Sequence, residues 1–183
     1  MIEEALTHEE RAELLRIARR AIKEKLDDNF WNPERPLTAR LAEKQGAFVT
    51  LHIRGMLRGC IGYIVGYKPL YLTVAEMARS AAFGDPRFPP LSPAEYPKID
   101  IEITVLSPLR QIDNPSEVQV GKHGLLVRKG PYQGVLLPQV PVEEGWDRDT
   151  FLAHTCRKAG LPSSCWHDED TELFVFSGEV FGE

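Results

Sequence analysis

Apolar side chains recur every three or four positions in three parts of the chain, which is the spacing of an amphipathic helix. The first such run covers residues 14–26, and Thr7 with Glu10 forms a capping box ahead of it. The second covers residues 70–82, and the third extends from about residue 148 to residue 159. We therefore expect three helices, the first beginning just after Thr7.

Other stretches have the patterns of β-strands. AFVTLHIRGMLRGCIGYIV alternates with period two on both sides of Arg54-Gly55 and predicts a β-hairpin. KIDIEITVLSP predicts a half-buried strand, and GLLVRKG with GVLLPQV predicts a second hairpin around Gly130 and Pro131. Near the C-terminus, ELFVFSGEVF predicts one more strand.

The predicted order of elements is helix, hairpin, helix, strand, hairpin, helix, strand. This order contains too few strand-helix alternations for a doubly wound parallel sheet. We expect an α+β fold, with a mostly antiparallel sheet flanked by helices. Because no repeat, low-complexity tract or linker interrupts the sequence, we expect a single domain over residues 1–183.

Charge and composition exclude some functions. The 183 residues include 22 basic and 27 acidic side chains, which give a net charge of -5 and no basic patch of the kind that nucleic-acid binding needs. No apolar run approaches the ~18 residues of a membrane span, and the N-terminal residues are acidic and amphipathic. We expect a soluble cytoplasmic protein that binds neither nucleic acid nor membrane.

The three cysteines, Cys60, Cys156 and Cys165, cannot all pair, and their spacing matches no disulfide framework. We therefore expect reduced thiols, with Cys156 on the apolar side of the third helix. His154 and His167 lie near Cys156 and Cys165, but these spacings do not match structural zinc patterns. No metal site is expected.

The hexapeptide LRGCIG lies in the second strand of the first hairpin, so the register of that hairpin decides the neighbours of Cys60. A two-residue turn places Arg58 on the apolar face. A three-residue turn ending at Gly55 places Cys60 opposite Phe48, with Arg58 and Cys60 together on the less apolar face, roughly 7 Å apart. We favour the second register, in which the nearby guanidinium would stabilise a thiolate.

The chemistry of Cys60 stays open at this point. In the favoured register His52 is about 13 Å away along the strands, which excludes it as a general base. The plausible imidazoles are then His123 and His154, which the sequence does not bring near. Cys60 is either a small packing residue between two glycines or a reactive or ligand-contacting thiol.

Three prolines stiffen the segment DPRFPP, so Asp85 and Arg87 are presented on a rigid stretch of chain. Such a stretch loses little entropy on binding. The simpler alternative is a local turn bond for Asp85 and a surface ion pair for Arg87. Glu102, in the predicted single strand, is either exposed or faces the same site.

Five blocks follow one another along the chain: LRGCIG, AAFGDPRFPPLSPAEYPKIDIEITVLSP, GLLV, VLLPQVPVEEGWDRDTFLAHTCRKAGLP and a late CW. In order and spacing they resemble the AMMECR family, also called AmmeMemoRadiSam system protein A. The resemblance runs from about Leu6 to the last strand. It implies an α+β fold with a larger and a smaller lobe and a cleft between them, near LRGCIG.

The resemblance also implies site residues and partners. It implies a Memo-like protein and a radical SAM enzyme as partners. In the binding hypothesis, the cleft and the proline-rich segment recognise such a partner or an unidentified small molecule. The iron–sulfur cluster would belong to the enzyme, because this chain has no three-cysteine motif, and we expect no cofactor here. The positions that match the family's motifs are Arg58, Gly59, Cys60, Gly62, Asp85, Arg87, Glu102, Gln139 and Cys156.

Two functions follow from these residues. The first is a binding or adaptor component of an AmmeMemoRadiSam-type system. The alternative is an enzyme with Cys60 as a thiolate nucleophile, Arg58 and Arg87 holding an anionic group, and Glu102 as a polar partner. We favour the first, because Cys60 has no placed base.

Overall fold

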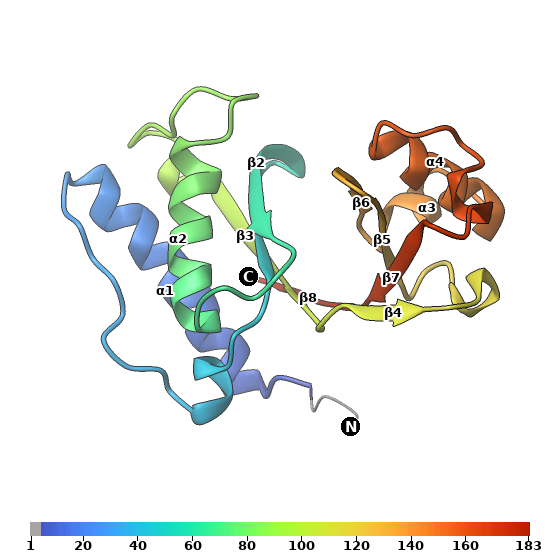
Figure 1. Cartoon of the computed structure of the whole chain (residues 1–183). Coiled ribbons are helices and arrows are strands. Elements are labelled where there is room, and N and C mark those ends of the chain that lie inside the picture. Colours follow the sequence, from blue (N-terminus) through green and yellow to red (C-terminus); the bar gives the residue numbers. More distant parts are fainter. Residues whose placement is uncertain (1–4) are drawn as a thin grey trace. The chain divides into compact units, whose positions relative to one another are not determined.

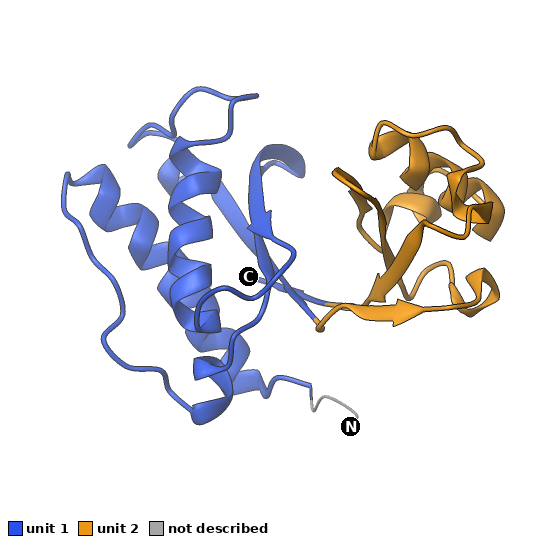
Figure 2. Cartoon of the chain, viewed as in Figure 1, with its two compact units in different colours: residues 1–106, 179–183 blue, residues 107–178 orange. Residues whose placement is uncertain are grey.

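The computed structural model describes residues 5–183 and divides into two compact units (Figure 2). Unit 1 contains the residues up to 106 together with 179–183, and unit 2 is the uninterrupted stretch 107–178. Each unit has its own antiparallel sheet and its own apolar core. The predicted α+β class is confirmed, whereas the single domain over the whole chain stays a prediction.

Unit 1 is a four-stranded sheet with two helices on one face (Figure 1). The strand order is β2-β1-β3-β8, so β2 is an edge strand. Helix α2 packs against β1 and β2, and α1 packs against α2 and β3. The elements are α1 (His8–Leu26), β1 (Ala47–Ile53), β2 (Met56–Tyr63), α2 (Leu70–Phe83), β3 (Ile99–Leu106) and β8 (Gly178–Gly182), with 3₁₀ turns η1 (Ala39–Ala42) and η2 (Tyr96–Lys98).

The sequence pattern explains how unit 1 forms its core. The predicted capping box is present, because the Thr7 hydroxyl accepts from the Glu10 backbone N–H and the Glu10 carboxylate accepts from the Thr7 N–H. Every second residue of β1, namely Ala47, Val49 and Leu51, is fully buried. These side chains meet the apolar stripe of α1 in one core, so the opposite face of the sheet points away from the helices.

Unit 2 is a second four-stranded sheet, with the order β4-β7-β5-β6, and α4 packs against β5 and β6. The predicted hairpin around Gly130 and Pro131 is confirmed, because Lys129 pairs with Tyr132. The elements are β4 (Arg110–Ile112), η3 (Pro115–Glu117), β5 (Gly124–Lys129), β6 (Tyr132–Leu136), α3 (Val140–Glu143), α4 (Arg148–Lys158), η4 (Cys165–His167) and β7 (Glu172–Phe176).

The C-terminal strand predicted from ELFVFSGEVF is two strands. It is interrupted at Ser177, so that β7 pairs with β4 and β5 while β8 lies beside β3 in the other sheet. The apolar residues on the two sides of the break do not by themselves reveal it, although Ser177-Gly178 between them is a dipeptide typical of turns. No helix among residues 5–183 is long and apolar enough to cross a lipid bilayer.

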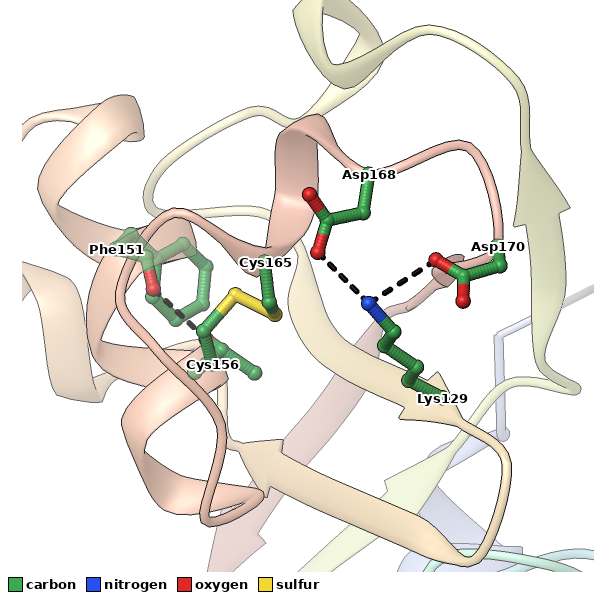
Figure 3. Close-up of a disulfide and its surroundings, with 7 residues drawn as sticks. Lys129, Phe151, Cys156, Cys165, Asp168 and Asp170 are labelled. Carbon is green, nitrogen blue, oxygen red and sulfur yellow. Dashed lines mark hydrogen bonds and ion pairs between the residues drawn. A yellow bond between two sulfur atoms is a disulfide. The ribbon is translucent and has the colours of Figure 1, made fainter.

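The expectation of three reduced thiols was wrong. Cys156, at the end of α4, and Cys165, in η4, form a disulfide, and Cys60 is left as the free cysteine (Figure 3). The two cysteines are nine residues apart, and the chain reverses between them at Gly160, which has a φ of +78°. The predicted burial of Cys156 is confirmed. Gly160 and Pro162 predict that the helix ends here, but the spacing of the cysteines did not reveal that the turn brings the two sulfur atoms together.

Candidate functional site

The first hairpin adopts neither of the two registers considered from the sequence. Its turn is the two-residue one, with Arg54 and Gly55 at φ values of +52° and +77°, and Ile53 pairs with Met56. The register then shifts between Leu51 and His52, because Arg58 is an extra residue in β2. Such a β-bulge moves every later residue by one position.

Because of this bulge, Cys60 has other neighbours than those predicted from the sequence. Cys60 lies opposite Thr50 and not opposite Phe48, which pairs with Gly62. Without a bulge, the two-residue turn would place the charge of Arg58 on the apolar face, opposite Leu51. Because Arg58 is the extra residue, Leu51 pairs with Gly59 instead. Leu57, which was assigned to the core face, is instead exposed opposite His52.

Arg58 is directed by the bulge into a set of bonds with the segment after α2. Its Nε and Nη2 bond the carboxylate of Glu95 at 2.8 and 3.2 Å, and Nη2 also donates to the Pro89 carbonyl at 2.8 Å. Only 8% of Arg58 is exposed, and its guanidinium lies 5.8 Å from the centre of the Phe88 ring. The pairing with Arg58 lowers the pKa of Glu95 to about 2. Arg58 therefore holds the proline-rich segment in place.

Asp85 and Arg87 bond the edge of β2 at Cys60. The Asp85 carboxylate accepts from the Cys60 backbone N–H at 3.0 Å, and Arg87 Nη2 donates to the Cys60 carbonyl at 3.4 Å. Arg87 also donates three hydrogen bonds to Asp85, from its backbone N–H, Nε and Nη2. These bonds hold the pKa of the buried Asp85 well below its usual range. An edge strand with its outward backbone groups bonded in this way does not offer them to another chain.

The thiol of Cys60 lies in a row of three residues across the sheet. Its Sγ shares a 3.1 Å hydrogen bond with the Thr50 hydroxyl, and Glu102 of β3 pairs with Thr50 on the other side. All three residues are half-buried, on the face of the sheet that points away from α1 and α2. Burial raises the pKa of Cys60, although Thr50 and Arg87 act in the opposite direction. The environment thus favours the thiol over the thiolate.

The predicted guanidinium neighbour of Cys60 was Arg58, but the guanidinium that acts on the thiol is that of Arg87. The side chain of Arg87 is 56% exposed, in contrast to that of Arg58. The separation from His52 also differs from the expectation. Because Thr50 lies opposite Cys60, His52 is two positions along β1, roughly 7 Å and not 13 Å away.

The two other candidate imidazoles belong to unit 2, and both have local partners. His123 is buried, and its Nδ1 accepts from the Gln119 backbone N–H at 3.1 Å. His154 stacks on the Trp146 ring, with the ring centres 3.9 Å apart. Among residues 5–183, the hydrogen-bond partner of the Cys60 sulfur is Thr50, which is not a base at neutral pH.

Of the other predicted site residues, Gly59 and Gly62 serve close packing in unit 1, and Gln139 lies in unit 2. Gly59 faces α2 so closely that a Cβ there would lie 2.1 Å from the Ala81 carbonyl oxygen, and a Cβ at Gly62 would meet the Phe48 ring. Gln139 lies exposed in unit 2, just before α3, and makes no capping bond with its side chain. Gln139 therefore belongs to a different unit from the residues around Cys60.

Glu95 was not identified from the sequence, although it is the partner of Arg58. A signal was present in the stretch SPAE, because serine followed three residues later by glutamate is a capping-box pattern. The Glu95 carboxylate indeed accepts from both the backbone N–H and the hydroxyl of Ser92.

Comparison with known proteins gives one family and several relatives. The AMMECR1 family model matches residues 15–181, a range that includes parts of both units. Protein MK0488 of Methanopyrus kandleri is 50% identical over 189 residues, which cover 98% of this chain and 91% of that protein. Protein NEQ441 of Nanoarchaeum equitans is 43% identical, covering 93% of this chain and 98% of its own.

A solved structure has the same fold. The crystal structure of uncharacterized protein PH0010 from Pyrococcus horikoshii superposes with a TM-score of 0.85 at 45% sequence identity. The match covers 93% of this chain and 89% of that chain. The names of these three relatives state no activity, so a function has to be argued from the site itself.

Proposed function

The chain belongs to the AMMECR1 family, and on this premise we propose that it is a non-catalytic binding component. Its binding surface is the outer face of unit 1, which we define as the sheet surface around Cys60, Thr50 and Glu102 with the adjoining Arg87. This surface is rigid because β2 is bonded to the DPRFPP segment at Cys60. A preformed surface loses little entropy when a partner binds.

The observation that carries this proposal is the environment of Cys60. A nucleophilic cysteine needs a lowered pKa or an adjacent base. Here burial raises the pKa of the thiol, and its hydrogen-bond partner is a hydroxyl. The charged groups that would hold an anionic substrate are also engaged, Arg58 by Glu95 and Arg87 by Asp85. These contacts support binding over catalysis.

The partners we propose are those that the family resemblance implies, a Memo-like protein and a radical SAM enzyme. Exposed Arg87 and half-buried Glu102 give the outer face one group of each charge. Such groups contribute to partner choice more than to total affinity. In this proposal the chain is an adaptor of an AmmeMemoRadiSam-type system, with the segment LRGCIG at its binding surface.

The test is a binding titration with the purified Memo-like protein and the radical SAM enzyme from the same genome, at about 10 μM. Glu102→Lys reverses a charge on the outer face, and Glu34→Lys makes the same change at an exposed position elsewhere in unit 1. Cys60→Ser keeps a small polar side chain but removes the sulfur.

We expect Glu102→Lys to weaken binding by at least about 10-fold, because a reversed charge at an interface is strongly unfavourable. Glu34→Lys and Cys60→Ser should bind within about 3-fold of the unmodified chain. The proposal fails if neither protein binds, or if the two charge reversals have equal effects.

A further inference from the structure

Unit 2 contains a pocket of about 430 Å³ that has no part in the site described above. Its lining residues come from the end of the edge strand β4, from η3, from η4 and the turn after it, and from the start of β7. Its volume is within the usual range of small-molecule sites. The pocket is lined by Gln111, Ile112, Asp113, Pro115, Trp166, His167, Asp168, Glu169, Thr171, Glu172 and Leu173.

The charged residues that line this pocket are all acidic. Four of the lining residues are acidic, and none is lysine or arginine. Two of the four acids are already paired, Asp168 with Lys129 and Glu172 with Arg128. Figure 3 shows Lys129 held between Asp168 and Asp170, so its charge already neutralises an acidic residue of the pocket.

Asp113 and Glu169 are the two acids of the wall that remain. Both are exposed, and across residues 5–183 neither forms a hydrogen bond or ion pair. A third unused group is the Thr171 hydroxyl, whose buried oxygen lacks a hydrogen-bond partner among the described residues. The two carboxylates attract a positive charge. The Thr171 oxygen is closed off from solvent, so it accepts a hydrogen bond from a ligand N–H once its side chain rotates toward the pocket.

We propose that this pocket binds an organic cation, a small molecule or side chain that ends in a primary ammonium or guanidinium group. Asp113 and Glu169 hold the charge, and Thr171 accepts from an N–H of the ligand. The alkyl part of the ligand lies against Trp166 and Leu173. A bare metal ion fits less well, because the described part of the chain has no cluster of three or more His, Cys, Asp or Glu arranged to hold one.

The wall is held in place before any ligand arrives. The disulfide fixes Cys165, the residue directly before Trp166, to the buried end of α4. The turn continues through hydrogen bonds from the Asp168 N–H to the Cys165 carbonyl and from the Thr171 N–H to the Asp168 carbonyl. On the opposite side, Ile112 pairs with Leu173. A preformed wall of this kind lowers the entropic cost of binding.

The experiment titrates the full chain with two probes while the Trp166 indole signal is followed by NMR. Agmatine represents a free organic cation, and N-acetyl-arginine amide represents an arginine side chain of a protein. Butylurea is the neutral control. The double variant Asp113→Asn, Glu169→Gln removes both unpaired charges of the pocket. The control is Glu144→Gln, which neutralises an exposed acidic residue of unit 2 outside the pocket.

We expect at least one cationic probe to bind with a Kd of roughly 1 mM or below, with no saturable binding of butylurea. The double variant should weaken binding at least about 10-fold, Thr171→Val about 3-fold, and Glu144→Gln not at all. Preference for agmatine identifies a free amine as the ligand, and preference for the amide identifies a protein side chain. The proposal is overturned if neither cation binds at 10-fold that concentration, or if the double variant binds as well as the unmodified chain.

Discussion

Asp85 is only 4% exposed and accepts hydrogen bonds from two backbone N–H groups and from the Arg87 side chain. Its role is to fix the chain after α2 to the edge of β2. Arg58 completes the same attachment through Glu95 and the Pro89 carbonyl. Arg58 is thus paired with Glu95, and Asp85 is paired with Arg87, while the neighbouring side chains of Cys60 and Thr50 are uncharged.

Replacement of Asp85 tests this role at the level of one residue. Asp85→Asn keeps the size of the side chain but removes the charge and one acceptor oxygen. Hydrogen bonds to charged groups contribute about 1.5–3 kcal/mol each, so we expect the free energy of unfolding to fall by about 2–3 kcal/mol. Urea denaturation of the variant measures this loss.

The control for Asp85 is Asp100, an exposed carboxylate on β3 of the same unit. Asp100→Asn should change stability by no more than about 0.5 kcal/mol. Equal effects of the two substitutions would show that the bonds of Asp85 contribute nothing specific.

Among the elements, the hairpin of β1 and β2 depends on Gly59 for its contact with α2. A Cβ at this position would lie 2.1 Å from the Ala81 carbonyl oxygen, which belongs to helix backbone and has no freedom to rotate away. Gly59→Ala should therefore cost roughly 3 kcal/mol or more, measured by thermal or urea unfolding.

Gly55 offers a matched control in the same hairpin. It has a φ of +77°, and a Cβ there would have no neighbour within 4 Å. Because asparagine tolerates this backbone region, Gly55→Asn should stay within about 1 kcal/mol of the unmodified chain. If Gly59→Ala lowers the free energy of unfolding no more than Gly55→Asn does, β2 does not pack against α2 as closely as described.

Helices α1, α2 and α4, both hairpins and the strand at residues 99–106 were predictable, because each is encoded by local periodicity or by turn residues, whereas the short α3 was not predicted. The bulge at Arg58 was not, since it depends on a distant partner, Glu95, that stabilises the extra residue. The break at Ser177 and the disulfide were missed for a similar reason. Both depend on which segments meet in the fold, and the local turn signals at Ser177-Gly178 and Gly160 do not specify this.

The disulfide also bears on the location of the protein. Disulfides between structural cysteines are rare in reducing compartments. The cytoplasmic location expected from the sequence therefore stays a prediction, which the redox state of Cys156 and Cys165 in intact cells would help to decide.

For the molecule as a whole, the two units should respond differently to pH. In unit 2, burial lowers the pKa of His123, and the charges of Lys122 and Arg110 act in the same direction. Below about pH 6.5 the unfolded chain therefore binds a proton that the folded unit resists, so unit 2 loses stability as the pH falls. In unit 1, Asp85 and Glu95 have lowered pKa values, so their contribution is lost only below about pH 4.

Hydrogen exchange at pH 7.5 and pH 5.5, corrected for intrinsic rates, separates these two effects. We expect protection to decrease in β5 and β7 of unit 2 at pH 5.5 but not in β1 and β3 of unit 1. His123→Asn should remove this difference, whereas replacement of the exposed His167 should not. A parallel decrease in both units would contradict the assignment to His123.

If Cys60 takes no part in thiol chemistry, as proposed, its buried environment should keep it protonated at neutral pH. The most direct measurement is the rate of alkylation of the folded chain by iodoacetamide as a function of pH, since Cys156 and Cys165 are paired and Cys60 is the free thiol. We predict an apparent pKa above the value of about 8.5 for an unperturbed thiol, falling toward that value when the chain is unfolded in urea without reductant. An apparent pKa near 7 or below in the folded chain would contradict the binding role and restore Cys60 as a nucleophile.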